Sequence, residues 1–264
     1  MQNSWRLVQK RKLPALTNSL FIEGLPGIGN VGKVAIDFMI DELKAAKIYE
    51  ITSSSFPHSV FVAENNLVEL PTIEIFHKKI KGRDLLLMGG DVQPIDEESC
   101  YEFTYHVLDL LEKHGIKEII TLGGIGLADI PKKPKVYMTG NSKQHMDSFQ
   151  RELKGIIERS LYGVVGPIVG VSGLLVGLAS QRDMKAACML AETYGHPMYL
   201  GIKGARELLT ALDKKLGLKL NLKKLEKEIK DIESEMLKRA EHLPEGQMAG
   251  TFVKGKGPDM NYIG

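Results

Sequence analysis

The chain has 264 residues, of which 43% are hydrophobic and 26% are charged, and its net charge is +2. A chain of this length can bury a substantial core, and the composition is ordinary for a soluble globular protein. A net charge this close to zero creates no strong field for nucleic acid or an anionic membrane, so we expect neither as a partner. Two cysteines and no apolar leader at the amino terminus indicate a reducing, cytoplasmic setting.

Apolar strands alternate with helices along the first two thirds of the chain. The expected strands span 20–23, 47–51, 60–63, 67–70, 72–76, 84–88, 118–122, 136–139, 164–171 and 186–191. The expected helices span 34–43, 97–113 and 205–216, with a further helix from 174 and a helical or irregular segment over 143–159. Glycines follow several strands, and the most apolar strands have the character of central parallel ones. The pattern therefore predicts an α/β fold with a mostly parallel central sheet and helices on both faces.

Residues 161–180 carry no charge, so this segment raises the question of a membrane span. Its glycines and Pro167 would make a poor continuous helix. We therefore interpret it as a buried strand, a turn at Ser172-Gly173 and the start of a helix. Ser172 lies in a sequence similar to a nucleophile elbow, but Leu174 stands where that motif needs its second glycine. Ser172 is more simply explained as a helix cap.

A glycine loop follows the first expected strand and opens a helix. Gly27, Gly29 and Gly32 have the spacing of a dinucleotide-binding fingerprint, in which backbone N–H groups receive a phosphate. Lys33 adds positive charge, which makes the loop a candidate anion site. A P-loop would need Ser or Thr at the next position to hold magnesium, and Val34 is there instead. The same glycines would also serve a tight turn from a strand into a helix.

No other group of residues forms a recognisable catalytic or metal site. None of the seven histidines is spaced from another histidine or a cysteine as metal ligands are, so we expect no metal. Asp91 and Glu192 lie at or near strand ends, where ligands of open α/β sheets bind. Nothing in the sequence pairs them as an acid and a base, and we expect structural roles for both.

The chain is expected to consist of a core domain over 1–217, a helix over 218–243 and a flexible tail over 244–264. The helix carries apolar residues at spacings of three and four in a charged background, which allows two interpretations. It packs on its own domain, or it packs against another subunit. The candidate oligomerisation residues are Leu222, Leu225, Ile229, Ile232 and Met236.

Five segments, in this order, resemble the proteasome assembly chaperone family in its archaeal-type form. They are residues 24–33, 82–94, 121–126, 166–175 and 190–193. The similarity extends from about residue 18 to residue 235, and the ordered set is far more specific than any single motif. It implies a three-layer α/β/α fold similar to purine nucleoside phosphorylases. It also implies homo-oligomers that assist proteasome assembly or bind the proteasome core through flexible carboxyl-terminal tails.

The carboxyl terminus resembles the docking signal of such proteins in a shifted register. That signal has a hydrophobic residue and then tyrosine second from last, whereas Tyr262 is third from last here. Tyr262, Ile263 and the carboxylate of Gly264 are therefore the candidate docking residues, since a partner's pocket can capture a terminal carboxylate.

The leading hypothesis is thus a homo-oligomeric chaperone or adaptor whose partners are itself and either proteasome subunits or a paralogous chaperone. It assigns no catalytic residue and no cofactor. The alternative is a nucleotide-dependent enzyme, ATP-grasp-like or dinucleotide-binding, that uses the loop from Gly27 to Lys33.

Overall fold

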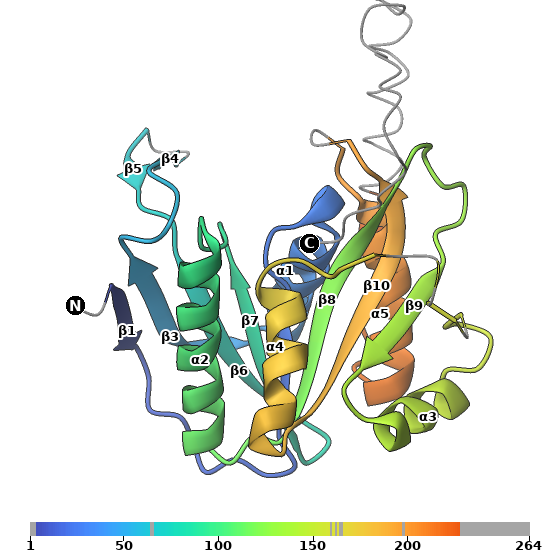
Figure 1. The fold of residues 1–264 in the computed structure, drawn as a ribbon, viewed down its shortest axis with the longest axis horizontal. Helices are drawn as coiled ribbons and strands as arrows, with labels where there is room; N and C mark the ends of the chain where they lie inside the picture. Colours follow the sequence, from blue (N-terminus) through green and yellow to red (C-terminus); the bar gives the residue numbers. More distant parts are fainter. Residues whose placement is uncertain are drawn as a thin grey trace, which may run out of the picture.

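The computed structural model describes residues 4–63, 66–158, 160–161, 163, 166–196 and 199–227 (Figure 1). The strands of its large sheet are β1 (Trp5–Gln9), β2 (Leu20–Glu23), β3 (Ala46–Ser53), β6 (Ile73–Ile80), β7 (Arg83–Gly90), β8 (Glu118–Leu127), β9 (Val136–Gly140) and β10 (Lys185–Tyr194). A separate hairpin consists of β4 (Phe61–Val62) and β5 (Val68–Glu69). The helices are α1 (Val31–Leu43), α2 (Glu97–Lys113), α3 (Lys143–Glu152), α4 (Val171–Ala179) and α5 (Ile202–Leu216), with short 3-10 turns at Ile28–Asn30 and Ser180–Arg182.

The large sheet is mixed, so the prediction of a mostly parallel sheet was wrong. Its strand order is β1-β3-β6-β7-β2-β8-β10-β9. The central strands β7, β2, β8 and β10 are parallel to one another. β6, β3 and β1 on one side and β9 on the other pair antiparallel. The α/β class is confirmed, and the similarity to phosphorylases stays a prediction.

A two-residue connection explains why β6 and β7 are antiparallel. Ile80 pairs with Arg83, so that only Lys81 and Gly82 lie between the strands. Both residues have positive φ angles, 49° and 79°. Two consecutive residues with positive φ match the turns that join antiparallel strands, whereas a parallel connection needs a dozen or more residues.

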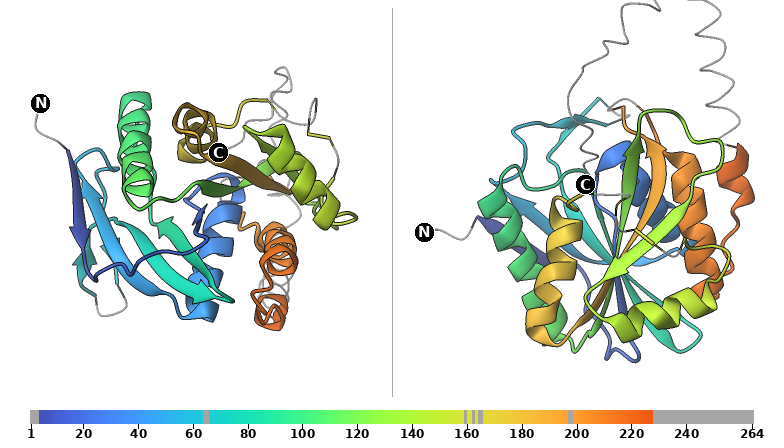
Figure 2. Two further views of the ribbon diagram at one scale, coloured as in Figure 1. Left: turned by 90° about the horizontal axis from the view of Figure 1, so that it is seen from below. Right: turned by 45° about the vertical axis from the view of Figure 1, so that its right-hand side comes forward.

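Helices cover both faces of the sheet and enclose two apolar cores (Figure 2). On one face α2 and α4 contribute residues such as Phe103 and Leu175. On the other face α1 and α5 contribute residues such as Ile36 and Leu208, and Phe149 of α3 joins them. The described chain is therefore three layers deep, with the sheet in the middle.

Several elements match the sequence prediction, and two do not. α2 has the predicted bounds, while β7, β8 and β10 are longer than predicted. β1 was not predicted; it is anchored by Trp5, whose ring lies 5.0 Å from that of Phe103. The strand predicted over 164–171 was wrong, because the described residues 166–170 belong to no strand and α4 begins at Val171. Ser172 is consequently inside the first turn of α4, and Gly170, with φ of 84°, occupies the capping position.

Within the described residues, no helix combines the length and the apolar character needed to cross a membrane. The uncharged segment that raised this question contains α4, which is only nine residues long.

α1 crosses the sheet at very close range because two glycines meet at the crossing. A Cβ on Gly32 would clash with the carbonyl oxygen of Leu122 in β8, and a Cβ on Gly24 would clash with the carbonyl oxygen of Gly32. Both obstacles are backbone atoms, which cannot move aside as a flexible side chain can. The helix and the sheet therefore touch backbone to backbone here.

The variant Gly32→Ala is therefore expected to lower the free energy of unfolding by about 1–3 kcal/mol, the usual cost of overpacking a core. Gly177 in α4 is a matched control, because a Cβ there meets nothing within 4 Å. Gly177→Ala should raise the same free energy by about 0.5–1 kcal/mol, since alanine is the better helix former. Urea unfolding of the two variants and the wild type measures both effects. Equal effects at the two positions would contradict the close crossing.

Candidate functional site

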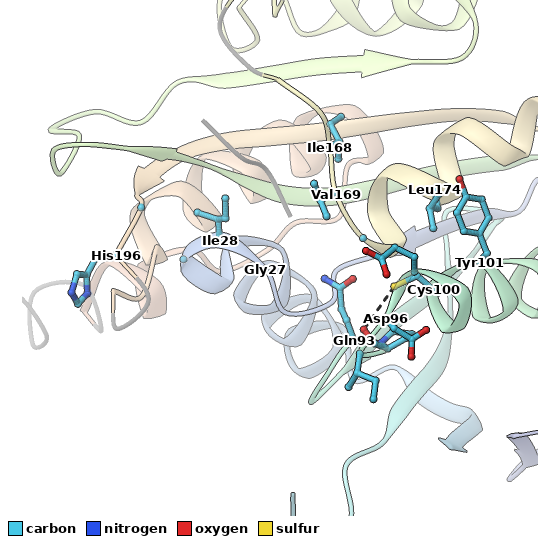
Figure 3. Close-up of a pocket in the computed structure, with 16 residues that line it drawn as sticks. Gly27, Ile28, Gln93, Asp96, Cys100, Tyr101, Ile168, Val169, Leu174 and His196 are labelled. Atoms are coloured by element: carbon cyan, nitrogen blue, oxygen red, sulfur yellow. Dashed lines mark hydrogen bonds between the residues drawn. The ribbon is translucent and has the colours of Figure 1, made fainter. Parts of the chain in front are cut away.

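A cleft of about 700 Å³ lies at the carboxyl ends of the parallel strands. Its walls come from the loop after β2, the segment from the end of β7 into α2, the segment that leads into α4, and the residues after β10. The lining residues are Gly27, Ile28, Gly29, Gln93, Pro94, Ile95, Asp96, Glu97, Cys100, Tyr101, Ile168, Val169, Gly170, Leu174, Gly195 and His196 (Figure 3). The chain leaves β2 toward α1 on one face and leaves β7 toward α2 on the other. Ligands of open α/β sheets bind at such a divergence.

Gln93 connects two walls of the cleft through hydrogen bonds. Its side-chain Nε2 donates to the carbonyl oxygen of Pro26, and its Oε1 accepts from the backbone N–H of Val171 at 3.0 Å. The second bond satisfies a free amide at the start of α4. Gly170 leaves room for it, because a Cβ there would lie 2.6 Å from Gln93 Oε1. Gln93 lies within a segment that carries the family resemblance, but the sequence did not assign it a role, since both of its partners are distant in the chain.

The structure separates the four residues of the predicted anion loop. Gly27 and Gly29 line the cleft, whereas Gly32 lies in the crossing of α1 over the sheet. Gly29 has φ of 60°, which favours glycine. The Lys33 Nζ donates to the carbonyl oxygen of Gly90 at 3.0 Å and pairs with Asp37 at 2.9 Å, so its charge is used within the fold.

The charges on the cleft walls are unfavourable for phosphate. Asp96 and Glu97 are acidic, and the described lining contains no lysine or arginine. Asp96 Oδ1 accepts from the Ser99 N–H at 2.8 Å, and this bond lowers the pKa of Asp96. Asp96 therefore stays ionised at neutral pH. Figure 3 shows His196 at the far end of the cleft from Asp96.

Cys100 in the cleft wall is poorly suited to act as a nucleophile. Its Sγ donates to the carbonyl oxygen of Pro94 at 3.7 Å. Burial and then the negative charges of Asp96 and Glu97 raise the pKa of its thiol. The thiolate is the reactive form of cysteine, and this environment disfavours it. The walls thus offer apolar contacts and acidic charge, which suit binding of a neutral or cationic group.

A buried polar cluster lies between α4 and the sheet. Glu23, Thr121 and Cys188 are direct neighbours across β2, β8 and β10, and all three are fully buried. Thr121 Oγ1 donates to the carbonyl oxygen of Ser172 at 3.2 Å, which ties the cluster to α4. Burial, and then the negative charge of Glu23, raises the pKa of Cys188 to about 12.

Glu23 is the most perturbed group of this cluster. Its Oε1 accepts from the Leu25 N–H at 2.8 Å, while its Oε2 has no hydrogen-bond partner among the described residues. Burial raises the pKa of Glu23 to about 7, and the Leu25 amide and the nearby Ser172 side chain offset part of that rise. From the sequence, Glu23 was expected only as the last residue of an apolar strand. A carboxylate after three apolar residues was the available signal.

Asp91 and Glu192 lie apart and have structural partners, as expected. Asp91 Oδ2 accepts from the Thr72 N–H at 3.0 Å. Glu192 accepts from the Tyr137 hydroxyl at 3.2 Å and from the Lys135 N–H at 3.0 Å. These bonds fix loops next to the strand ends.

Two of the candidate oligomerisation residues pack on their own chain. Leu225 is 1% exposed within the core under α1 and α5, and Leu222 is half-buried against that core. Ion pairs from Lys224 to Glu42 and from Arg206 to Glu226 hold this segment against the helices. Ile229, Ile232 and Met236, and the docking candidates Tyr262, Ile263 and Gly264, lie outside the described residues.

Comparisons of the sequence and of the structure with known proteins agree on one family. The sequence profile of the PAC2 family matches residues 21–240. The chain is also 27% identical over 264 residues to the uncharacterized protein MJ1210 of Methanocaldococcus jannaschii, covering 96% of this chain and 95% of that relative.

Two solved structures from Pyrococcus furiosus are similar over almost their full lengths. PbaB, an archaeal proteasome activator, is 33% identical with a TM-score of 0.82, and the match covers 90% of this chain and 99% of PbaB. PbaA, an archaeal homolog of proteasome-assembly chaperone, is 25% identical with a TM-score of 0.75, and the match covers 94% of this chain and 96% of PbaA.

The raised pKa of Glu23 makes stability depend on pH. Between its ordinary value of 4.5 and about 7, the folded protein keeps a proton that the unfolded chain releases. The free energy of unfolding should therefore fall as pH rises through this window, by on the order of 3 kcal/mol from this group. In Glu23→Gln this contribution is absent, so the stability of the variant relative to wild type should increase from pH 5 to pH 8.

Urea unfolding at several pH values measures that difference. The histidines His114 and His145, whose pKa values burial lowers, contribute a slope of opposite sign in both proteins and cancel in the comparison. Glu98→Gln, at an exposed carboxylate, is the control and should follow the wild type. Parallel curves for the wild type and Glu23→Gln would show that Glu23 is already ionised at pH 5.

The cleft charges and the engaged Lys33 also lead to a prediction about nucleotides. Calorimetric titration with ATP-magnesium and with NAD should detect no tight binding, and ATP hydrolysis should not exceed background. A micromolar dissociation constant for either ligand would instead support the nucleotide-dependent enzyme.

Proposed function

Because the chain belongs to the PAC2 family, we propose that it is a homo-oligomeric chaperone or adaptor that assists proteasome assembly or binds the proteasome core. The supporting observation is its similarity to PbaB, an archaeal proteasome activator, at 33% identity over 90% of this chain. PbaA, an archaeal homolog of proteasome-assembly chaperone, supports the same class of role. Because the sequence contains only two cysteines, we also propose that this activity takes place in the reducing cytoplasm.

The cleft supports a binding role better than a catalytic one. The acids Asp96 and Glu97 face the cleft without a nearby nucleophile of lowered pKa among the described lining residues. Glu23 has the perturbed pKa typical of functional carboxylates, but it lies in the buried cluster and is not part of the cleft lining. Apolar walls are suited to holding a segment of another protein.

The tail is proposed to supply docking on the proteasome core. Residues 244–264 are rich in glycine and contain few apolar anchors, chiefly Phe252, Met260, Tyr262 and Ile263. Such a composition cannot build a core of its own, so its anchors are available to a partner. Tyr262, Ile263 and the Gly264 carboxylate are the proposed contact groups.

The homo-oligomer is proposed to use the apolar residues of the helix that follows the core. Leu225 is already buried in its own chain, so its substitution would destabilise the monomer and would not report on association. Ile229, Ile232 and Met236 remain the residues proposed for this contact.

Deletion of residues 260–264 is expected to reduce capture of a purified archaeal proteasome core particle by at least tenfold. Folding and native mass should not change, because the anchors act on a partner. Pull-downs with intact and truncated protein, with circular dichroism and light scattering on the same samples, measure these effects. The double variant Lys254→Ala/Lys256→Ala changes the same tail but keeps its last residues, and it should retain binding. Equal capture by all three proteins would remove the docking role and leave the family assignment intact.

A further inference from the structure

The hairpin of β4 and β5 stands away from the three-layer core (Figure 1). Its aliphatic side chains are exposed. Val62 pairs directly with Val68, so the two side chains lie on one face of the ribbon. Val60 and Leu70 flank these strands, and the alternation of side chains along an extended chain, continued by one residue at each end, would place them on that same face. Val60, Val62, Val68 and Leu70 are 51%, 71%, 66% and 69% exposed. We call these four residues the hairpin face.

A hairpin this small needs a covering surface to be stable. Its ladder has only two residue pairs, and an isolated two-stranded hairpin is marginally stable in water. The described part of its own chain does not provide the cover, because all four side chains of the hairpin face remain mostly exposed there. Contiguous exposed apolar surface on a protein marks a contact with another molecule.

We propose that the hairpin face packs against a second copy of this chain. The four side chains carry no charge, and the one charged residue of β5, Glu69, pairs with Phe61 on the reverse face. Permanent interfaces between identical subunits are the most apolar class, whereas transient partners meet more polar surfaces. An exposed apolar face needs a partner that is always present. A second copy meets this need, because it is made together with the first.

The size of the face fits this occupant. The four side chains expose on the order of 400 Å² per copy, so two facing copies bury roughly 800 Å² before anything else is counted. The hairpin backbone adds to this area and brings the contact toward the ~1,200 Å² of a specific interface. Two aliphatic ribbons related by a two-fold axis can be self-complementary, because each residue then meets its equivalent or its cross-strand neighbour.

The test is the double variant Val62→Thr/Val68→Thr, studied by analytical ultracentrifugation over a dilution series of the full chain. Threonine keeps the shape and the strand preference of valine, so the hairpin can still form. Its hydroxyls lack partners in an apolar contact, and the dissociation constant of the oligomer should rise at least tenfold. The control Leu7→Thr/Ile130→Thr changes two other exposed apolar residues, 46% and 51% exposed, and should match the wild type.

Hydrogen exchange of the wild type provides a measurement that needs no variant. The amides of residues 60–70 should be protected at high protein concentration and lose that protection on dilution. A monomeric wild type, an unchanged dissociation constant for the threonine variant, or exchange independent of concentration would each overturn the proposal. Loss of proteasome capture with unchanged mass would assign the face to that other partner and would also overturn it. This inference rests on the proposed homo-oligomer: a monomeric wild type would remove both, whereas an unchanged dissociation constant for the threonine variant of an oligomeric protein would overturn the hairpin face alone. Capture that depends on the tail tests the proteasome role separately.

Discussion

The backbone contact between α1 and the sheet is the constraint on which the other features depend. It exists because Gly24 and Gly32 lack side chains where the helix meets β8. The contact places the Ile28–Asn30 turn directly over the strand ends, and Gly29 there accepts a hydrogen bond from the Gly201 N–H at 2.7 Å. Gly201 is the cap of α5. One close crossing therefore sets the positions of both long helices on this face and of one wall of the cleft.

The opposite wall depends on polar bonds. Gln93 joins the loop after β2 to the first amide of α4, and Thr121 joins β8 to the same turn of α4. The bond to Val171 satisfies a buried amide at the start of α4, which has no partner within the helix, and the three bonds together hold this wall in place. The neighbouring Glu23 is tolerated because its raised pKa lets the carboxyl stay largely protonated below neutral pH. The cleft is thus preformed, and the acids on its rim select against anionic ligands.

Sequence patterns predicted the parts of the fold that local chemistry determines. α2 was predicted at about its observed bounds because His114 and Gly115 end it, and the structure adds Asp96 as its amino-terminal cap. β7 and β8 were predicted too short, since the pattern stopped at glycines that still pair in the sheet. The strand directions depended on positive φ angles at Lys81 and Gly82, which the composition of that turn does not reveal. Gln93 was missed because its role depends on partners that only the fold brings close. Leu225 shows a related limit. The same apolar spacing along a helix occurs where the helix packs on its own core and where it packs against another subunit, so the sequence cannot distinguish the two.

The segment that leads from β3 into the hairpin is attached to the cleft wall. The Ile95 N–H donates to the carbonyl oxygen of Ser55 in this segment at 3.3 Å. Phe56, next to that bond, is buried against Trp5 and cannot swing freely. Association through the hairpin face would therefore involve a hairpin whose preceding segment is held both by the core and by the cleft wall.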